Sequence, residues 1–399
     1  MNKWQLILPS AEPDWTLLTL WAVLVSIGVT MVASASIAFA AAQYGDTFYF
    51  VERHLIFLLM GVASSAVVFL IPGSLWKTLS VPLMVLALVL LVMVLIPGVG
   101  KKVNGSQRWI SFGFFAVQIS ELAKFAVIVF FASYFAKRHP STVNSWKEFG
   151  VLIALLGMIL MLLVMEPDFG STVVIGATSI AIMFIAGLKL RYFLPMAMGA
   201  IGVLAVLAVA SPYRLKRLVT FMDPWADQFN SGYQLTQSLI AFGRGEWLGV
   251  GLGNSVQKLF YLPEAHTDFV FSIFAEEMGL IGCVVLLALF ALLIKRILLV
   301  AMRCYGRGLL FYSYACFGVA IIFALQVFIN IGVACGLLPT KGLTLPFISY
   351  GGSSLIVCCS MLALVMRASM EVRVVPATRT AVTNSSRVRP TTATTGSVA

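Results

Sequence analysis

The acidic side chain best placed for catalysis lies where a long polar segment leads into an apolar one. Asp268 ends the stretch Tyr261-Leu262-Pro263-Glu264-Ala265-His266-Thr267-Asp268, directly before the apolar run 269–294. A carboxylate that is shielded from water at the end of an apolar helix can act as a general base, when its pKa suits the reaction and the proton lies within its reach. The simpler interpretation is an Asp that caps the following helix, whose N-terminal dipole favours an acid. Glu276 follows two turns later on nearly the same face, and a carboxylate in an apolar helix is typical of a functional site.

A second pair of charges lies inside another apolar run. Glu121 and Lys124 are three residues apart and therefore share one face of a helix. They form either a structural ion pair that joins two helices or part of a site, because ionisable residues within a span usually face a cavity. Lys101, Lys102 and Arg108 precede this helix. Such a basic cluster suits the oxygens of a diphosphate, and it suits anionic lipid head groups equally well.

A third segment joins two apolar runs through backbone that cannot be helical throughout. It reads Pro339-Thr340-Lys341-Gly342-Leu343-Thr344-Leu345-Pro346-Phe347-Ile348-Ser349-Tyr350-Gly351-Gly352-Ser353-Ser354. Membrane proteins tolerate such backbone at depth only where it is buried in protein or lines a wet cavity. The segment therefore predicts either a re-entrant turn closed by glycines or an anion site. In the second case Lys341 supplies a cation, and the amides of Gly351, Gly352 and Ser353 form a helix N-terminus.

Membrane helices must position these segments, because the composition excludes a soluble fold. Of the 399 residues 60% are hydrophobic and 11% charged, with a mean hydropathy of +0.98, whereas soluble chains carry roughly a quarter charged residues. Apolar runs of about 20 residues cross a bilayer as helices. A secreted disulfide scaffold, a disordered hub and a nucleic-acid-binding protein are therefore excluded. We predict an all-α polytopic membrane protein with ten transmembrane helices, over residues 15–41, 54–72, 80–97, 116–136, 149–166, 170–187, 192–210, 269–294, 308–336 and 350–370.

The basic residues predict the orientation of these helices. The formal net charge of +11 reflects Lys and Arg that gather in alternate short loops, and the positive-inside rule then places both termini in the cytoplasm. Residues 1–14 form a cytoplasmic N-terminus, 15–370 the membrane domain and 371–399 a flexible cytoplasmic tail. The first apolar run is too long for a signal peptide, so we expect an uncleaved helix. Residues 211–268, between the seventh and eighth helices, form a large extracytoplasmic loop whose aromatic content predicts a folded cap.

The carboxylates are distributed unevenly in this topology. Topology itself does not require acids on one side, so chemistry, cation binding or an outward partner must account for them. The six cysteines and three histidines have no metal-ligand spacing. Ten of the sixteen acids fall on the outer side or at outer helix mouths: Asp46, Glu52, Glu121, Glu166, Asp168, Asp223, Asp227, Glu246, Glu264 and Asp268.

Several of these segments resemble the signature motifs of the SEDS family (shape, elongation, division and sporulation), and the resemblance covers nearly the whole chain. Within the family, Pro339–Thr344 and Gly249–Asn254 are more similar to the cell-division member, of a Gram-negative bacterium, than to the elongation member. The matching segments are Tyr261–Asp268 with Gln257-Lys258 before it, Gly336–Ser354, Arg108-Trp109-Ile110, Ser120–Lys124 and Pro167–Gly170.

The resemblance implies a peptidoglycan glycosyltransferase of the bacterial inner membrane that polymerises lipid II at the division septum. It further implies a class B penicillin-binding protein as transpeptidase partner, beside the division proteins FtsQ, FtsL and FtsB. Asp268 matches the essential acid of the family, and we expect it to act as general base. A divalent cation, Mg²⁺ or Mn²⁺, can share the stabilisation of the leaving diphosphate, although no dedicated metal site is readable. We expect substrate contacts from Arg108, Glu121, Lys124, Lys258, His266, Glu276, Lys341, Ser349, Gly351 and Gly352.

Two other functions are compatible with the same features. A lipid II flippase would also use helices with intramembrane charges and broken backbone, but the acids on the outer side favour chemistry at one face over alternating access. No internal repeat of the kind many transporters have is evident. A non-catalytic scaffold of the division machinery would use the basic tail and the outer cap.

Overall fold

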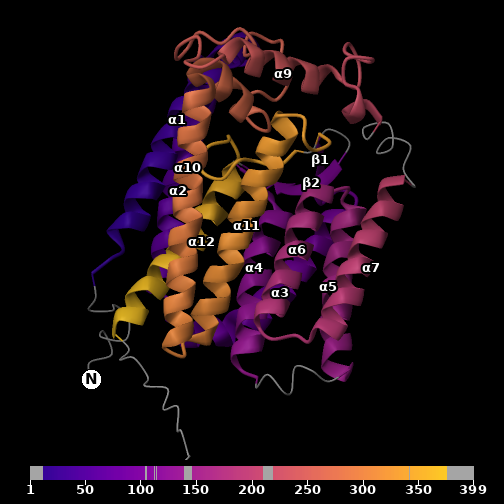
Figure 1. Cartoon of the computed structure of the whole chain (residues 1–399), viewed down its shortest axis with the longest axis vertical. Coiled ribbons are helices and arrows are strands. Elements are labelled where there is room, and N and C mark those ends of the chain that lie inside the picture. Colours follow the sequence, from indigo (N-terminus) through magenta and orange to yellow (C-terminus); the bar gives the residue numbers. More distant parts are fainter. Residues whose placement is uncertain are drawn as a thin grey trace, which may run out of the picture.

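The computed structural model is a bundle of long helices with a small sheet and one short helix near one end (Figure 1). It describes residues 12–103, 106–111, 113, 115–138, 146–209, 219–340 and 342–374. Lys341, most of the N-terminal segment 1–14 and most of the tail 371–399 lie outside the described residues. The helices are α1 (Trp15–Tyr44), α2 (Tyr49–Leu70), α3 (Gly73–Leu95), α4 (Ile119–Ala136), α5 (Trp146–Met165), α6 (Phe169–Ile185), α7 (Leu190–Val209), α9 (Tyr233–Gly245), α10 (Val270–Gly306), α11 (Leu310–Ala334) and α12 (Gly352–Val374).

Hydropathy and length identify the helices that suit a membrane. Among the described residues seven qualify, namely α1, α2, α3, α4, α10, α11 and α12. Shorter apolar stretches, Phe149–Met165 and Phe169–Ile185, lie in α5 and α6, and α7 has 20 residues. The prediction of a mostly helical membrane protein is confirmed at this level. Ten crossings, the orientation and the domain limits stay predictions.

Helices α4 and α12 form the inside of the bundle. Most of their residues are buried, whereas α2 leaves most of its apolar surface exposed. Outer helices of a membrane bundle bury little because lipid covers the rest of their surface. The polar side chains of α4 and α12, among them Glu121, Lys124 and Ser354, are therefore enclosed by protein.

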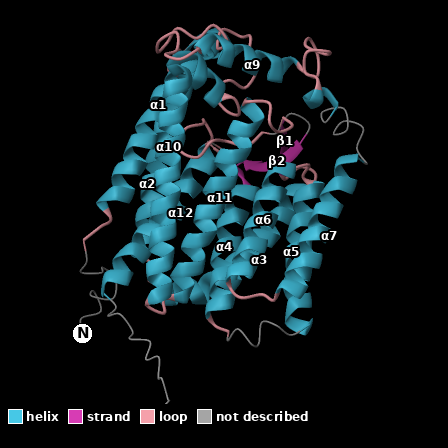
Figure 2. Cartoon of the chain, in the orientation of Figure 1, coloured by secondary structure: helices cyan, strands magenta, loops and turns pink. Residues whose placement is uncertain are grey.

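A three-stranded antiparallel sheet connects α3 to α4, which the sequence had not predicted. Its strands are β1 (Gly100–Val103), β2 (Ser106–Ser111) and β3 (Ala116–Gln118), in the order β1-β2-β3. Trp109 pairs with Lys101 on one side and with Gln118 on the other. Figure 2 shows the strands toward the end of the bundle that α9 covers. The sheet thereby places Arg108 and the first turn of α4 at that end.

Helix α10 is interrupted near its start, and a neighbouring loop supplies the backbone hydrogen bonds that the interruption removes. Gly279 has a φ of 65°, outside the helical region, so the backbone groups around it lose their helical partners. Residues 246–251 replace those partners. Position 249 must be a glycine, because the Cβ of any side chain there would come within 2.2 Å of the Glu277 carbonyl oxygen. The four hydrogen bonds run from Val250 N to Glu276 O (3.0 Å), Gly251 N to Glu277 O (3.1 Å), Leu280 N to Glu246 O (2.9 Å) and Ile281 N to Trp247 O (3.1 Å).

The segment before α10 covers one end of the bundle (Figure 1). Helix α9 packs on α10 and α11, where the Ser238 hydroxyl lies 2.6 Å from that of Ser272 and donates to the Ala334 carbonyl at 2.7 Å. Residues 211–218, the first part of the predicted cap 211–268, lie outside the described residues. At the opposite end, where α1 begins, Arg373 of α12 donates to the carbonyl of Glu12 at 2.9 Å.

Candidate active site

The structure brings Asp268 and the segment 342–350 together. Asp268 precedes α10, whose N-cap is Phe269, and its side chain is partly exposed. A methyl group on Gly342 would come within 2.7 Å of Asp268 Oδ2. The buried Asn330 of α11 donates from Nδ2 to the carbonyls of Asp268 (2.9 Å) and Leu343 (2.6 Å). The carboxylate therefore lies against the 342–350 segment with its backbone tied to it.

His266, two residues before Asp268, packs in an aromatic cluster. Its ring is 4.5 Å from that of Phe50, 5.7 Å from that of Tyr350 and 5.6 Å from that of Phe39. Its carbonyl accepts the Tyr350 N–H at 2.9 Å. Burial lowers the pKa of His266, although Glu264 opposes the effect. A neutral imidazole at neutral pH supports the loop by packing and carries no charge toward a phosphate.

The turn before α12 is held by its own side chains. Ser349 Oγ accepts the Leu345 N–H at 2.9 Å, and the hydroxyls of Thr344 and Ser354 are 2.8 Å apart. Gly352 begins α12 against the ring of Phe57, where a side chain would come within 2.7 Å. Gly351 and Gly352 remain half-buried, so the N-terminus of α12 forms part of the same end of the bundle.

Arg108 fastens the turn between α5 and α6. Its Nε donates to the Glu166 carbonyl at 3.2 Å, its Nη2 donates to the Pro167 carbonyl, and its Nη1 lies 3.9 Å from Asp168 Oδ1. Asp168 caps α6 through the Ser171 N–H and accepts a 2.7 Å hydrogen bond from Ser120. Burial alone would raise the pKa of Asp168, but Arg108 and the hydrogen bonds outweigh it and lower the pKa. Asp168 therefore stays ionised beside Arg108.

The pKa of Glu166, in the same turn, is shifted in the direction opposite to that of Asp168. Its side chain is fully buried, and neither carboxyl oxygen has a hydrogen-bond partner among the described residues. Burial and the charge of Asp168 raise the pKa of Glu166 to about 8, against the effect of Arg108. Glu166 is thus mostly neutral at pH 7. The sequence placed it among the outer acids without a role, since the motif alone does not reveal its burial.

Glu121 and Lys124 form an ion pair within α4. Lys124 Nζ donates to Glu121 Oε1 at 2.6 Å, and both side chains are buried. Glu121 Oε2 has no hydrogen-bond partner within the described ranges. The pair lies on one helix, so in this arrangement it does not join two helices by itself.

Glu276 and Glu277 hold the loop before α10 onto that helix. Ser255 Oγ donates to Glu276 at 2.5 Å, and Arg244 Nη1 lies 3.2 Å from Glu276. The adjacent Glu277 accepts hydrogen bonds from Lys258 (2.8 Å) and from Ser34 of α1 (2.6 Å). The structure therefore pairs Glu276 and Lys258, both predicted substrate contacts, with groups of the chain itself.

The segment 342–354 lies beside Asp268 and also contacts the helices next to Arg108. A methyl group on Gly170 would come within 2.8 Å of the Leu343 side chain, so the start of α6 packs on this segment. Ser353 Oγ accepts the Gln118 N–H at 3.2 Å, which ties α12 to the start of α4. The candidate site is therefore the end of the bundle where these loops converge.

A dedicated metal site would need a cluster of metal-binding side chains. In the part of the chain that the structure describes, no group of three or more His, Cys, Asp and Glu side chains is placed to hold a metal ion. The divalent cation stays a prediction.

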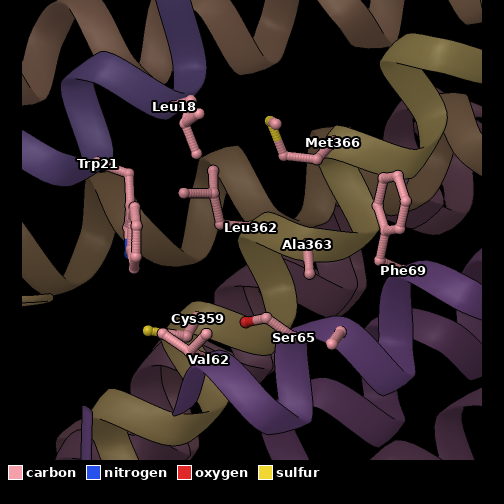
Figure 3. Close-up of a pocket in the computed structure, with 10 residues that line it drawn as sticks. Leu18, Trp21, Val62, Ser65, Phe69, Cys359, Leu362, Ala363 and Met366 are labelled. Atoms are coloured by element: carbon pink, nitrogen blue, oxygen red, sulfur yellow. The ribbon is translucent and has the colours of Figure 1, made fainter. Parts of the chain in front are cut away.

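An apolar cavity of about 280 Å³ lies away from this site, between α1, α2 and α12 (Figure 3). Trp21 and Leu18 reach it from the start of α1, and Phe69 and Met366 from the late turns of α2 and α12. It thus lies mainly in the half of the bundle opposite Asp268. Without a charged lining residue, it does not suit a diphosphate.

Known proteins are similar in sequence to this chain over most of its length. The model of the FtsW, RodA and SpoVE family, described as "Cell cycle protein", matches residues 14–374. The chain is 54% identical to "Probable peptidoglycan glycosyltransferase FtsW" of Saccharophagus degradans, over 90% of this chain and 92% of that protein. It is 50% identical to the protein of the same name from Alcanivorax borkumensis, over 88% of this chain and 92% of that protein.

Solved structures share the fold. One chain, from "Structural coordination of polymerization and crosslinking by a peptidoglycan synthase complex", matches with a TM-score of 0.73 at 29% identity, over 90% of this chain and 97% of that chain. The rod shape determining protein RodA of Thermus thermophilus matches with a TM-score of 0.67 at 28% identity, over 90% of this chain and 96% of that chain. Fold and site together define a polytopic helical membrane protein whose candidate site lies at one end of the bundle. The chain belongs to the FtsW, RodA and SpoVE family, which confirms the resemblance to the SEDS family.

Proposed function

We propose that this protein is a peptidoglycan glycosyltransferase that polymerises lipid II for septal cell-wall synthesis. The position of Asp268 carries the proposal: a partly exposed carboxylate on a supported loop, facing a glycine-containing segment at one end of a membrane bundle. The names of the relatives from Saccharophagus degradans and Alcanivorax borkumensis support the same activity.

In the proposed reaction, the 4-hydroxyl of an acceptor GlcNAc attacks the anomeric carbon of a lipid-linked donor. Asp268 takes the hydroxyl proton as general base. A β-1,4 bond forms while the bond between the anomeric carbon and the diphosphate breaks. The lipid diphosphate leaves with the electron pair, so positive groups must stabilise its developing charge.

We assign this stabilisation to Arg108, to Lys341 and to the amides at the start of α12. Arg108 is partly exposed at the same end of the bundle as Asp268. The N-terminal N–H groups of a helix bind anions, and Gly351 and Gly352 keep side chains away from them. A divalent cation, Mg²⁺ or Mn²⁺, would supply further positive charge to the diphosphate.

The proposed membrane topology puts this chemistry on the outer face. Ten helices, α1 to α7 and α10 to α12, cross the membrane, both termini are cytoplasmic, and the loop 211–268 is extracytoplasmic. The distribution of Lys and Arg supports this orientation. The contact between Arg373 and Glu12 supports placing both ends of the membrane domain on the same side, because it puts the start of α1 and the end of α12 at one end.

The proposed partner is a class B penicillin-binding protein, which would cross-link the new strands. The similar chain in a structure described as a peptidoglycan synthase complex of polymerization and crosslinking supports this pairing. We place the protein in the bacterial inner membrane at the division septum, together with FtsQ, FtsL and FtsB.

Reconstitution in liposomes with lipid II and the partner transpeptidase tests the function. The parent protein should produce glycan strands, and liposomes with the transpeptidase alone should produce none. A flippase would instead move fluorescent lipid II between leaflets without forming strands. A scaffold would bind the transpeptidase and do neither, and either of these results would refute the proposal.

A further inference from the structure

One buried amide connects the two loops of the candidate site. Asn330, on α11, is 1% exposed and donates from Nδ2 to the carbonyls of Asp268 (2.9 Å) and Leu343 (2.6 Å). An amide NH₂ has two hydrogens, so this pair of bonds uses both of them. The two carbonyls lie on loops far apart in sequence, and α11 serves as the common support.

Gly342 shows why this support matters for the carboxylate. The Cα of Gly342 is so close to Asp268 that a methyl group would come within 2.7 Å of Oδ2. A small shift of either loop therefore changes the direction in which the carboxylate points. Leu343 follows Gly342 directly and is buried, so a hydrogen bond to its carbonyl also locates Gly342.

We propose that Asn330 is a positioning residue for glycosyl transfer, which holds Asp268 and the 342–350 segment at the separation that the reaction needs. The inference rests on the proposed function, because it takes Asp268 as the base. Asn330 acts through the backbone of Asp268 and is too buried to contact lipid II. Its loss should therefore lower kcat and leave KM for lipid II nearly unchanged, since a misplacement of about 1 Å can cost on the order of 100-fold in rate.

Gln326 provides a matched control. It lies one turn before Asn330 on α11 and is also 1% exposed. Neither its Oε1 nor its Nε2 has a hydrogen-bond partner among the described residues. Gln326→Ala thus removes a buried amide from the same helix without removing a bridge between loops.

The test compares Asn330→Ala, Asn330→Leu and Gln326→Ala in the full chain, reconstituted with the partner transpeptidase and lipid II. Asn330→Leu keeps the branched shape of the side chain and removes the donors, so it serves if Asn330→Ala does not fold. Both Asn330 variants should lose kcat by about 10-fold to 100-fold with KM within about twofold. Gln326→Ala should keep kcat within about threefold of the parent.

Two results would overturn the inference. One is a parent-like kcat in Asn330→Leu, and the other is an equal loss of kcat in Gln326→Ala and Asn330→Ala. Asp268→Asn, measured in parallel, separates this failure from that of the proposed function. If Asp268→Asn keeps the parent rate, the assignment of Asp268 as the base is wrong. If Asp268→Asn abolishes polymer while Asn330→Ala and Gln326→Ala lose the same amount of kcat, only the role of Asn330 is wrong.

Discussion

Gly342 and Asp268 are so close that a single methyl group on the glycine would come within 2.7 Å of the carboxylate Oδ2 and 3.4 Å of its Cγ. Gly342 itself is exposed, so its small size serves the neighbouring carboxylate and not the packing of a core. The segment that begins at Gly342 therefore borders the Asp268 carboxylate directly.

Gly342→Ala should reduce polymerisation on the order of 10-fold to 100-fold, because the displaced carboxylate no longer meets the acceptor hydroxyl. The free energy of unfolding should change by no more than about 1 kcal/mol at this exposed position. Initial rates of strand formation and a thermal melt check both expectations. Gly306→Ala is the control, since a methyl group there meets nothing within 4 Å; equal activity of the two variants would contradict the prediction.

Glu166→Gln should change how stability depends on pH. The pKa of Glu166 rises from an ordinary 4.5 to about 8 on folding, so between these values the folded state binds a proton that the unfolded state has released. The parent therefore loses stability as pH rises from 4.5 to 8, by a few kcal/mol, and Glu166→Gln should lose less.

Thermal melts of the two proteins across this pH range measure the difference. Glu52→Gln, which removes an exposed acid from α2, serves as control and should follow the parent. Parallel curves for Glu166→Gln and the parent would show that Glu166 does not gain a proton on folding.

Lys258 and Glu277 should be coupled in a double-mutant cycle. Their charged atoms are 2.8 Å apart and both side chains are largely buried, so removal of one partner leaves an uncompensated charge and costs about 3–5 kcal/mol. Lys258→Met and Glu277→Gln should each be strongly destabilising, and the double variant should be less so than their sum. Additive changes in the free energy of unfolding would mean that the pair does not hold the loop.

Gly249→Ala should be more destabilising than Gly253→Ala, although both glycines lie in one loop with φ near +80° (80° and 85°). A methyl group at Gly249 would come within 2.2 Å of the Glu277 carbonyl oxygen, and at Gly253 it would meet nothing within 4 Å. We expect about 1 kcal/mol for the backbone conformation alone and at least 1–3 kcal/mol more for the clash. Similar melting temperatures for the two variants would argue against the pairing of this loop with the broken α10.

Apolar runs predicted the helices well and their ends less well. The run 15–41 corresponds to Trp15–Tyr44, whereas 269–294 corresponds to the much longer Val270–Gly306. Hydropathy falls at Lys295 and Arg296, but apolar residues resume at Ile297 and the helix continues, with Arg296 paired to Asp14 at 3.0 Å. The strands of 3 to 6 residues were missed because strand pairing, not local composition, defines them.

The site could be predicted where a motif carries an unusual charge and not where three-dimensional contacts decide. Asp268 was predicted as the base and residues of the segment 339–354 as substrate contacts, and the described residues Gly342 and Leu343 of that segment lie beside Asp268. Glu276 and Lys258 were predicted as substrate contacts, but each binds other residues of the chain. The sequence does not reveal these partners, because they come together only when the loop folds back on α10. Asn330 was overlooked because a single amide in an apolar run does not reveal which carbonyls it reaches.

The central claim is that the Asp268 carboxylate removes the proton from the acceptor hydroxyl. The most direct measurement is the rate of strand formation from lipid II by Asp268→Asn, which keeps the size of the side chain and removes its basicity. Asp223→Asn, at an exposed acid outside the site, is the control for the change itself. We predict that Asp268→Asn forms no detectable strands while it still binds the transpeptidase and melts like the parent. Strand formation at the parent rate by Asp268→Asn would contradict the account.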